Sequence, residues 1–120
     1  MATSAVSIVK VEGDRVEDAV REAIELAGGL EAAIPPGSSV LIKPNVVSPS
    51  RSGSGKITDA RVTQAVAKVV LERHPGRVII GEGSSVGYDF PGRKDSTHCL
   101  EVSGTAARAS PGGWAWSWST

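Results

Sequence analysis

Apolar and polar positions alternate near the start of the chain, over residues 5–11 (AVSIVKV). A period of two places successive side chains on opposite faces of an extended backbone, so the pattern predicts a first β-strand with one solvated face. Asp14 follows, with Glu17 three residues later, which is the spacing of a capping box at the start of a helix. Apolar residues then recur every three or four positions, which predicts an amphipathic helix that ends at Gly28-Gly29. The apolar stripe of this helix is Val16, Ala19, Val20, Ala23, Ile24 and Ala27.

Two later segments are predicted to form strands, residues 39–43 (SVLIK) and residues 77–81 (RVIIG). Their apolar residues are consecutive, which is typical of strands covered on both faces in a parallel sheet. Between them, a second helix is predicted to begin near Thr58 and Asp59 and to end at residues 74–76 (HPG). Its expected buried stripe is Val62, Ala65, Val66, Val69 and Val70. The order β-α-β-α-β predicts an α/β fold of three layers, with a small, mostly parallel sheet in the middle.

The composition restricts the classes of function. A chain of 120 residues has room for one domain. Its 13 basic and 13 acidic residues give a net charge of zero, which argues against nucleic acid as a partner. Cys99 is the single cysteine, so the chain builds neither an internal disulfide nor a four-cysteine zinc or iron–sulfur site. The sequence has no signal-peptide pattern and no apolar run of the roughly 20 residues that cross a bilayer, so we expect a cytoplasmic protein without membrane contact.

The last residues follow a different pattern. Residues 105–120 contain no acidic residue, and Trp114, Trp116 and Trp118 alternate with Ala and Ser. As a strand, this segment would expose an apolar face and favour aggregation. Because tryptophan has one codon, TGG, reading the segment two bases later gives an apolar run typical of a buried strand. One hypothesis is therefore a frameshift, tested by the nucleotide sequence, and the alternative is a genuine, poorly ordered tail. We expect residues 1–104 to be the N-terminal part of a longer α/β domain and residues 105–120 to be an aberrant or disordered tail.

Three segments together resemble one protein family. They are residues 40–49 (VLIKPNVVSP), 58–70 (TDARVTQAVAKVV) and 78–89 (VIIGEGSSVGYD). With the first predicted helix, they make the chain similar to the N-terminal part of the family of domain of unknown function 362 (DUF362). The resemblance implies an α/β fold and a prokaryotic cytoplasmic protein. It also implies iron–sulfur clusters in longer relatives that carry ferredoxin-type cysteines, but those cysteine ligands are absent here, so no cofactor is expected in this chain.

Candidate ligand-binding residues lie in the loops that follow the second and third predicted strands. In open α/β sheets, ligands bind at the carboxyl ends of the strands, where these loops converge. The candidates are Lys43, Asn45, Thr58, Asp59, Glu82 and Ser84. Lys43 suits a carboxylate or phosphate as a point charge, and Glu82 suits a base or a metal ligand. Ser52, Ser54 and the amides of Gly53 and Gly55 are candidates for an anion cradle at the start of the second helix.

Each candidate also has a structural interpretation. Lys43 at a strand end can simply be solvated, and Asn45 can hydrogen-bond the backbone of a turn. Thr58 and Asp59 are more often helix caps than ligands. Glu82, between two glycines, is harder to explain by structure alone.

Two functions are consistent with these residues, and the sequence does not decide whether the chain is an enzyme. The first is an uncharacterised, redox-associated or enzyme-like α/β protein that binds a small anionic or metal-bound ligand at the strand ends. The alternative is a non-catalytic interaction module or an inactive truncated remnant. In that case an open sheet edge favours self-association.

Overall fold

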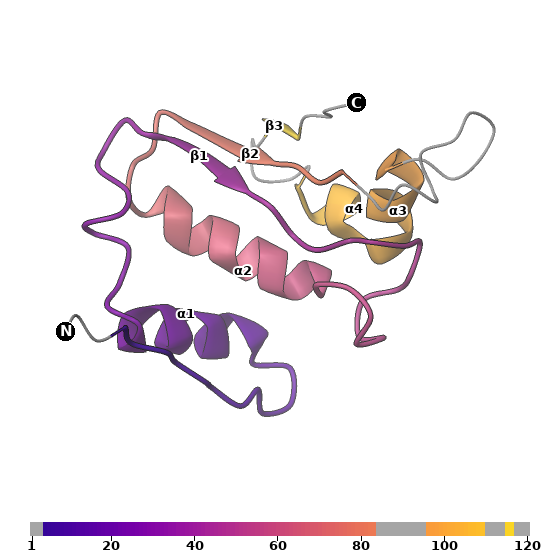
Figure 1. Ribbon diagram of the computed structural model, residues 1–120, viewed down its shortest axis with the longest axis horizontal. Helices are drawn as coiled ribbons and strands as arrows, with labels where there is room; N and C mark the ends of the chain where they lie inside the picture. The colour runs from indigo at the N-terminus through magenta and orange to yellow at the C-terminus, as the bar shows by residue number, and fades with distance from the viewer. Residues whose placement is uncertain (1–3, 84–95, 110–114, 117–120) are drawn as a thin grey trace.

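The predicted α/β class is confirmed by a computed structural model, which describes residues 4–83, 96–109 and 115–116 (Figure 1). The helices are α1 (Val16–Leu26), α2 (Ala60–Leu71), α3 (Ser96–Ser103) and α4 (Thr105–Ala109). The strands are β1 (Ser39–Ile42), β2 (Arg77–Ile80) and the short β3 (Ala115–Trp116). Within these ranges, no helix is long and apolar enough to span a membrane.

The three strands form one parallel sheet in the order β1-β2-β3, with β1 at an edge. β1 and β2 end within one residue of the two segments predicted as strands, and Val40 pairs with Val78 and Ile42 with Ile80. Two parallel strands need a crossover connection, and α2 supplies it here. The second helix and the two strands beside it are therefore confirmed.

One face of the sheet packs on α2, and the opposite face is exposed at the edge strand β1. Val78 is 7% exposed and Ile80 2%, and they pack against Val70 and Ala67 of α2. Leu41 of β1 is 63% exposed. The prediction that β1 is covered on both faces is therefore wrong, because α1 packs on α2 and not on the second face of the sheet (Figure 1). In the described part, the layers run from the sheet through α2 to α1, so α2 and not the sheet lies in the middle.

Residues 5–11 do not form the predicted first strand. They run as an extended segment beside α1, with Val6 85% and Ile8 91% exposed. The hydroxyl of Ser7 donates a hydrogen bond of 2.6 Å to the carbonyl of Ala23, which ties the segment to α1. The alternation indicated an extended backbone correctly. It does not specify a partner, and because α1 lies on α2, the segment reaches no sheet edge.

The two long helices begin in different ways. Asp59 is the N-cap of α2, and its carboxylate accepts a hydrogen bond of 2.8 Å from the backbone N–H of Arg61, so the predicted start of this helix is confirmed. α1 has no side-chain hydrogen bond at its N-cap, so the predicted capping box of Asp14 and Glu17 is wrong. Both carboxylates instead reach across to α2, where Asp14 pairs with Arg61 and Glu17 with Lys68.

α2 is buried over a wider arc than its predicted stripe. It contacts α1 on one side, the sheet on another and α4 near its start. Its buried residues are Ala60, Thr63, Ala65, Ala67, Val69 and Val70. Small residues outside the predicted stripe are buried because neighbours approach the helix from more than one side.

A second apolar core joins α3 to the long loop between β1 and α2. Cys99 and Leu100 of α3 pack there against Val46 and Ile57 of the loop. Thr105, which opens the predicted tail, is 2% exposed, and its hydroxyl shares a hydrogen bond of 2.9 Å with that of buried Ser103. The start of the predicted tail is thus helix α4. Beyond it, only residues 115–116 fall within the described part.

Candidate functional site

Lys43 and Glu82 form an ion pair where β1 and β2 end. The N–H of Gly81 donates a hydrogen bond of 3.0 Å to the carbonyl of Ile42, which holds the two strand ends side by side. The ammonium nitrogen Nζ of Lys43 lies 2.9 Å from each carboxylate oxygen of Glu82. The side chain of Glu82 is 3% exposed and that of Lys43 is 63% exposed. The arrangement is a buried carboxylate under an exposed ammonium, and the ammonium compensates the charge that burial would otherwise penalise.

Asn45 and Thr58 close the base of the loop between β1 and α2. The backbone N–H of Asn45 donates to the hydroxyl of Thr58 at 2.9 Å, and the backbone N–H of Thr58 donates to the carbonyl of Asn45 at 2.8 Å. Neighbouring Val46 is fully buried, whereas Asn45 is exposed. The pair of hydrogen bonds fixes the chain directly after Lys43 and leaves Asn45 at the surface.

The first turn of α2 has no backbone donor to offer an anion. The N–H of Ala60 donates to the hydroxyl of Ser52 at 2.8 Å. The N–H groups of residues 61–63 are all held by Asp59, the first by its carboxylate and the other two by its carbonyl. The predicted cradle of Ser52, Ser54 and the amides of Gly53 and Gly55 therefore gains no donor from the first turn of α2, and it stays a prediction. Ser52 also donates to the carbonyl of Ser103 at 2.7 Å, so its role in the structure is to join α2 to the end of α3.

The carboxylate of Asp59 is hydrogen-bonded to the side chain of Arg61. Arg61 donates to it from Nε at 3.1 Å and from a terminal guanidinium nitrogen at 3.0 Å. These hydrogen bonds hold the pKa of the Asp59 carboxyl below its ordinary value. The structural interpretation of Asp59 as a helix cap is confirmed, and a ligand contact by Asp59 or Thr58 stays a prediction.

Thr63 is a buried polar residue that the sequence pattern did not single out. It is 3% exposed, and its hydroxyl has no hydrogen-bond partner within the described part of the chain. Thr63 lies one turn before Ala67, which packs on Ile80. Glu82 lies two residues after Ile80, where the chain leaves β2. Helix and strand periodicities therefore put Thr63 on the side of α2 that faces the strand ends. The signal in the sequence is its spacing of three and four from the small residues Ala60 and Ala67.

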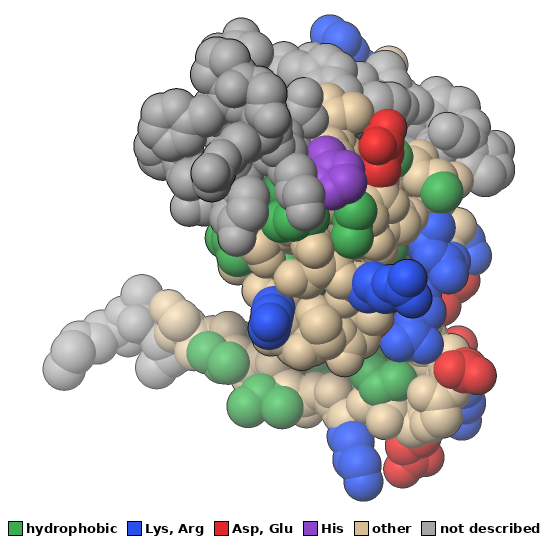
Figure 2. All heavy atoms as spheres, turned by 90° about the vertical axis from the view of Figure 1, so that its right-hand side faces the viewer, with side chains coloured by type: hydrophobic (Ala, Val, Ile, Leu, Met, Phe, Trp, Pro, Cys, Tyr) green, Lys and Arg blue, Asp and Glu red, His purple; other side chains and the backbone are tan. Residues whose placement is uncertain are grey.

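The end of the molecule formed by the loop between β1 and α2 carries exposed basic residues. Arg51 and Lys56 lie in the loop between β1 and α2, and both are exposed. Figure 2 looks at this end and shows Lys and Arg side chains across the middle of the face, where Asp and Glu are fewer. An anion that approaches from this side meets a favourable local charge although the whole chain is neutral.

The residues of this chain do not fit an iron–sulfur cluster. Ferredoxin-type clusters need four thiolates, and Cys99 is the single cysteine, fully buried in an apolar core. Across residues 4–83, 96–109 and 115–116, no three His, Cys, Asp or Glu side chains are grouped to hold a metal ion. Ser84, the last predicted site residue, lies outside the described residues.

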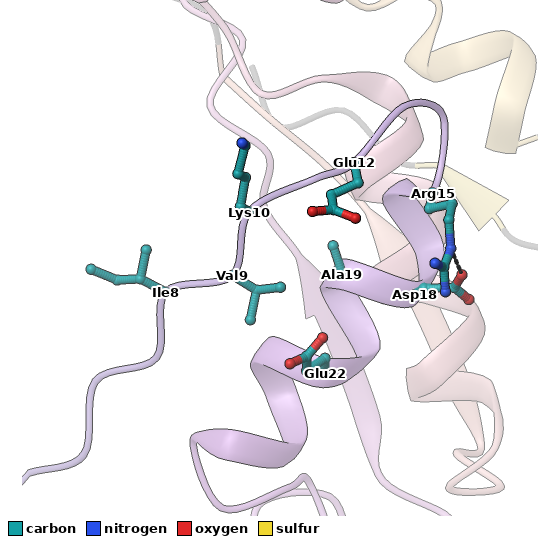
Figure 3. A pocket seen from close by; sticks show the side chains of 8 residues that line it. All are labelled: Ile8, Val9, Lys10, Glu12, Arg15, Asp18, Ala19 and Glu22. Carbon is teal, nitrogen blue, oxygen red and sulfur yellow. Dashed lines mark hydrogen bonds and ion pairs between the residues drawn. The ribbon is translucent and has the colours of Figure 1, made fainter.

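A cleft of about 320 Å³ lies elsewhere, between the N-terminal segment and α1 (Figure 3). In Figure 3 Val9 points toward α1, while Ile8 points away from it. Arg15 and Asp18 in its wall are paired at 2.8 Å. The lining residues are Ile8, Val9, Lys10, Glu12, Arg15, Asp18, Ala19 and Glu22. The cleft contains none of the residues predicted from the strand ends.

Comparison with known families assigns the chain. A family model described as Domain of unknown function (DUF362) matches residues 40–114. The chain belongs to the DUF362 family. The matched part of this DUF362 chain begins in β1, extends past the end of α4, and includes both Lys43 and Glu82. No curated protein and no solved structure matches the chain. The family description states no activity, so a function has to be argued from the site itself.

Proposed function

We propose that this DUF362 chain binds a small anionic ligand, free or metal-bound, at the carboxyl ends of β1 and β2. Lys43 is the residue that contacts the ligand. The observation that carries the proposal is the Lys43–Glu82 pair, because it holds an exposed ammonium in a defined position at the place where open α/β sheets bind ligands.

The hydrogen bonds of Lys43 to Glu82 leave one N–H donor of its ammonium group for a ligand. An ammonium group has three N–H donors, and the two oxygens of Glu82 accept two hydrogen bonds. The side chain of Lys43 is 63% exposed, so the third donor is open to solvent and to an oxygen of a carboxylate or phosphate. Glu82 is buried and hydrogen-bonded, so it restrains the otherwise flexible lysine and lowers the entropy lost when a ligand binds.

Binding is better supported than catalysis. Both oxygens of Glu82 accept hydrogen bonds from Lys43, so while the pair stands the carboxylate is engaged and is not a free base for a substrate proton. Glu82 as a metal ligand would first have to release Lys43. A cytoplasmic location and an association of the family with iron–sulfur proteins stay predictions.

Titration with inorganic phosphate, followed by amide NMR shifts of the full chain, tests this function. The parent is expected to show saturable shifts at residues that follow β1 and β2. Lys43→Gln is expected to weaken binding by about tenfold or more, because a hydrogen bond to a charged group contributes roughly 1.5–3 kcal/mol. Lys10→Gln is the matched control, since it removes an exposed lysine of the N-terminal segment, away from the strand ends, and is expected to bind as the parent does.

A second variant separates binding from stability. Lys43→Gln alone leaves the buried carboxylate of Glu82 without its ammonium, which destabilises the fold. The double variant Lys43→Gln/Glu82→Gln removes both charges, so it is expected to recover stability and still bind phosphate poorly. Equal phosphate affinity in the parent and in the double variant would overturn the proposed function.

A further inference from the structure

Two unpaired parts of the described chain are complementary to each other. One is the segment of residues 5–11, which has the alternation of a strand and exposes Val6 and Ile8 almost completely. The other is the outer edge of β1, which has no neighbouring strand in the described sheet. Leu41, which is 63% exposed, lies in that edge strand. A strand without a sheet and a sheet edge without a strand both leave backbone donors and acceptors to pair.

The N-terminal segment is weakly attached where it lies. Ser7 makes one hydrogen bond to α1. The cleft of about 320 Å³ separates much of the remaining segment from the helix. Figure 3 shows Ile8 directed away from α1, so its apolar surface gains no contact there. Releasing the segment therefore breaks few interactions.

The segment cannot pair with its own β1 while α1 stays in place. α2 lies between α1 and the sheet, and each packed layer adds about 8–10 Å, so the segment and the β1 edge are separated by roughly 20 Å. Five Cα steps lead from Val11 at the end of the segment to Val16 at the start of α1, and they span at most about 18 Å when extended. Pairing within one chain would require α1 to leave α2 and break the Glu17–Lys68 and Arg21–Glu72 ion pairs. A second copy has no such restriction.

We propose that two copies of this chain exchange their N-terminal segments, with residues 5–11 of each copy adding as a strand to the outer edge of β1 in the other. Alternate residues of a strand share a face, so Val6 and Ile8 lie together on one face of the extended sheet, which brings exposed apolar side chains next to the strand that carries Leu41. The four residues of β1 direct about half of their backbone groups outward, which gives about eight hydrogen bonds over two reciprocal contacts. That number falls within the roughly 10 ± 5 direct hydrogen bonds of a stable interface.

Light scattering coupled to size exclusion, over a dilution series of the full chain, tests the exchange. The parent is expected to have twice the mass of the chain at the higher concentrations. The variant Ile8→Pro/Val9→Pro is expected to be a monomer with unchanged helix content, because its two missing N–H groups point to both sides of the strand and proline disrupts pairing in either direction. Ser4→Pro, which lies before the segment, is the control and is expected to dimerise. A monomeric parent, or a dimer that persists in the double-proline variant, would overturn the proposal.

Cross-linking with a short bis-maleimide, which adds to one thiol at each end, identifies the strand's partner. A chain with Ile8→Cys is mixed with a differently tagged chain with Leu41→Cys. A covalent link between the two chains is expected. Cys99 is fully buried and does not compete. Absence of this link, or a link confined to one chain in the Ile8→Cys/Leu41→Cys double variant, would contradict exchange between copies. Neither experiment involves Lys43 or Glu82, so the exchange and the proposed function stand or fail separately.

Discussion

The part of the molecule built around α2 and the N-terminal part that ends with α1 are stabilised differently. α2 is capped by Asp59, and six of its residues are buried between the sheet, α1 and α4. α1 has no side-chain cap and two buried residues, Val16 and Ala19. It is attached to α2 by ion pairs whose side chains are largely exposed, including Arg21 with Glu72 at 2.7 Å.

An amphipathic pattern alone therefore does not determine how strongly a helix is held. Both helices have apolar stripes that the sequence makes visible. α2 lies between two layers and buries more than one side, whereas α1 is an outer layer and buries a narrow stripe. Burial of apolar area contributes more to stability than exposed ion pairs do, so we expect the two parts to respond differently to substitution, acid and salt.

The largest contrast is expected between a buried residue of the central part and an exposed residue of α1. Ile80→Ala is expected to lower the free energy of unfolding by about 2–5 kcal/mol, because Ile80 is 2% exposed against Ala67 and a cavity replaces its side chain. Leu26→Ala, at a residue that is 62% exposed, is expected to change it by about 0.5 kcal/mol or less. Urea denaturation measures both variants. Equal losses would show that the contrast between the two parts is wrong.

The next largest effect on stability is expected where the loops that lead into β1 and β2 meet. A Cβ added at Gly76 would lie 2.7 Å from the carbonyl oxygen of Gly37, so the two loops would have to move apart. We expect Gly76→Ala to lower stability by about 1–3 kcal/mol. Gly83→Ala is the control, because a Cβ there meets no atom within 4 Å. If thermal unfolding gave the same midpoint for both variants, the close approach at Gly76 would be refuted.

A smaller effect is expected at the start of α2, and it depends on pH. Asp59→Ala removes the cap and is expected to lower the free energy of unfolding by about 1 kcal/mol at neutral pH. Because Arg61 holds the pKa of Asp59 below its ordinary value of 3.8, the ionised carboxylate stabilises the fold above that pH. The stabilisation is lost as the pH falls through the lowered folded-state pKa, so the parent and the variant converge in acid.

Asp59→Asn separates the cap from the charge. The amide oxygen still accepts a hydrogen bond from the helix N–H but does not titrate in this range. We expect this variant to lie between the parent and Asp59→Ala in stability, and to have lost the contribution of residue 59 to the acid transition. A parent and an Asn variant with identical acid profiles would count against a paired carboxylate at this position.

The smallest effect is expected from salt at the α1–α2 contact. Raising NaCl from about 0.05 M to about 0.5 M shortens the distance over which exposed charges interact. Amide hydrogen exchange in α1 is then expected to accelerate a few-fold, with little change in α2. Arg21→Gln is the comparison variant, since it removes the pair with Glu72 and is expected to reduce the salt response. Equal acceleration of hydrogen exchange in both helices would indicate that α1 does not depend more on exposed ion pairs than α2 does.

The candidate site was predicted in part. Lys43, Asn45 and Glu82 were identified because they follow apolar strands, and Lys43 and Glu82 do meet where β1 and β2 end. Their direct pairing was not predicted, because the contact joins residues 39 positions apart in the sequence. Ser52 was predicted to help form an anion cradle, which stays a prediction, and its hydroxyl accepts a hydrogen bond from the N–H of Ala60 at the start of α2. This hydrogen bond was not predicted, because it joins residues eight positions apart across a loop that is also tied to the end of α3.

The local structure follows from the sequence alone: strands at residues 39–42 and 77–80, the α2 helix with its cap at Asp59, and the loop between β1 and α2. These follow from short-range periodicity, capping and turn chemistry, which depend on residues near one another. Three features depend on the tertiary fold: within the described residues the segment 5–11 has no sheet partner, α1 packs on α2, and Lys43 compensates the buried Glu82. The physical reason is that backbone pairing, helix packing and charge compensation are satisfied by whichever partner the fold brings near. An alternating or amphipathic pattern specifies the face to be covered and leaves its partner open.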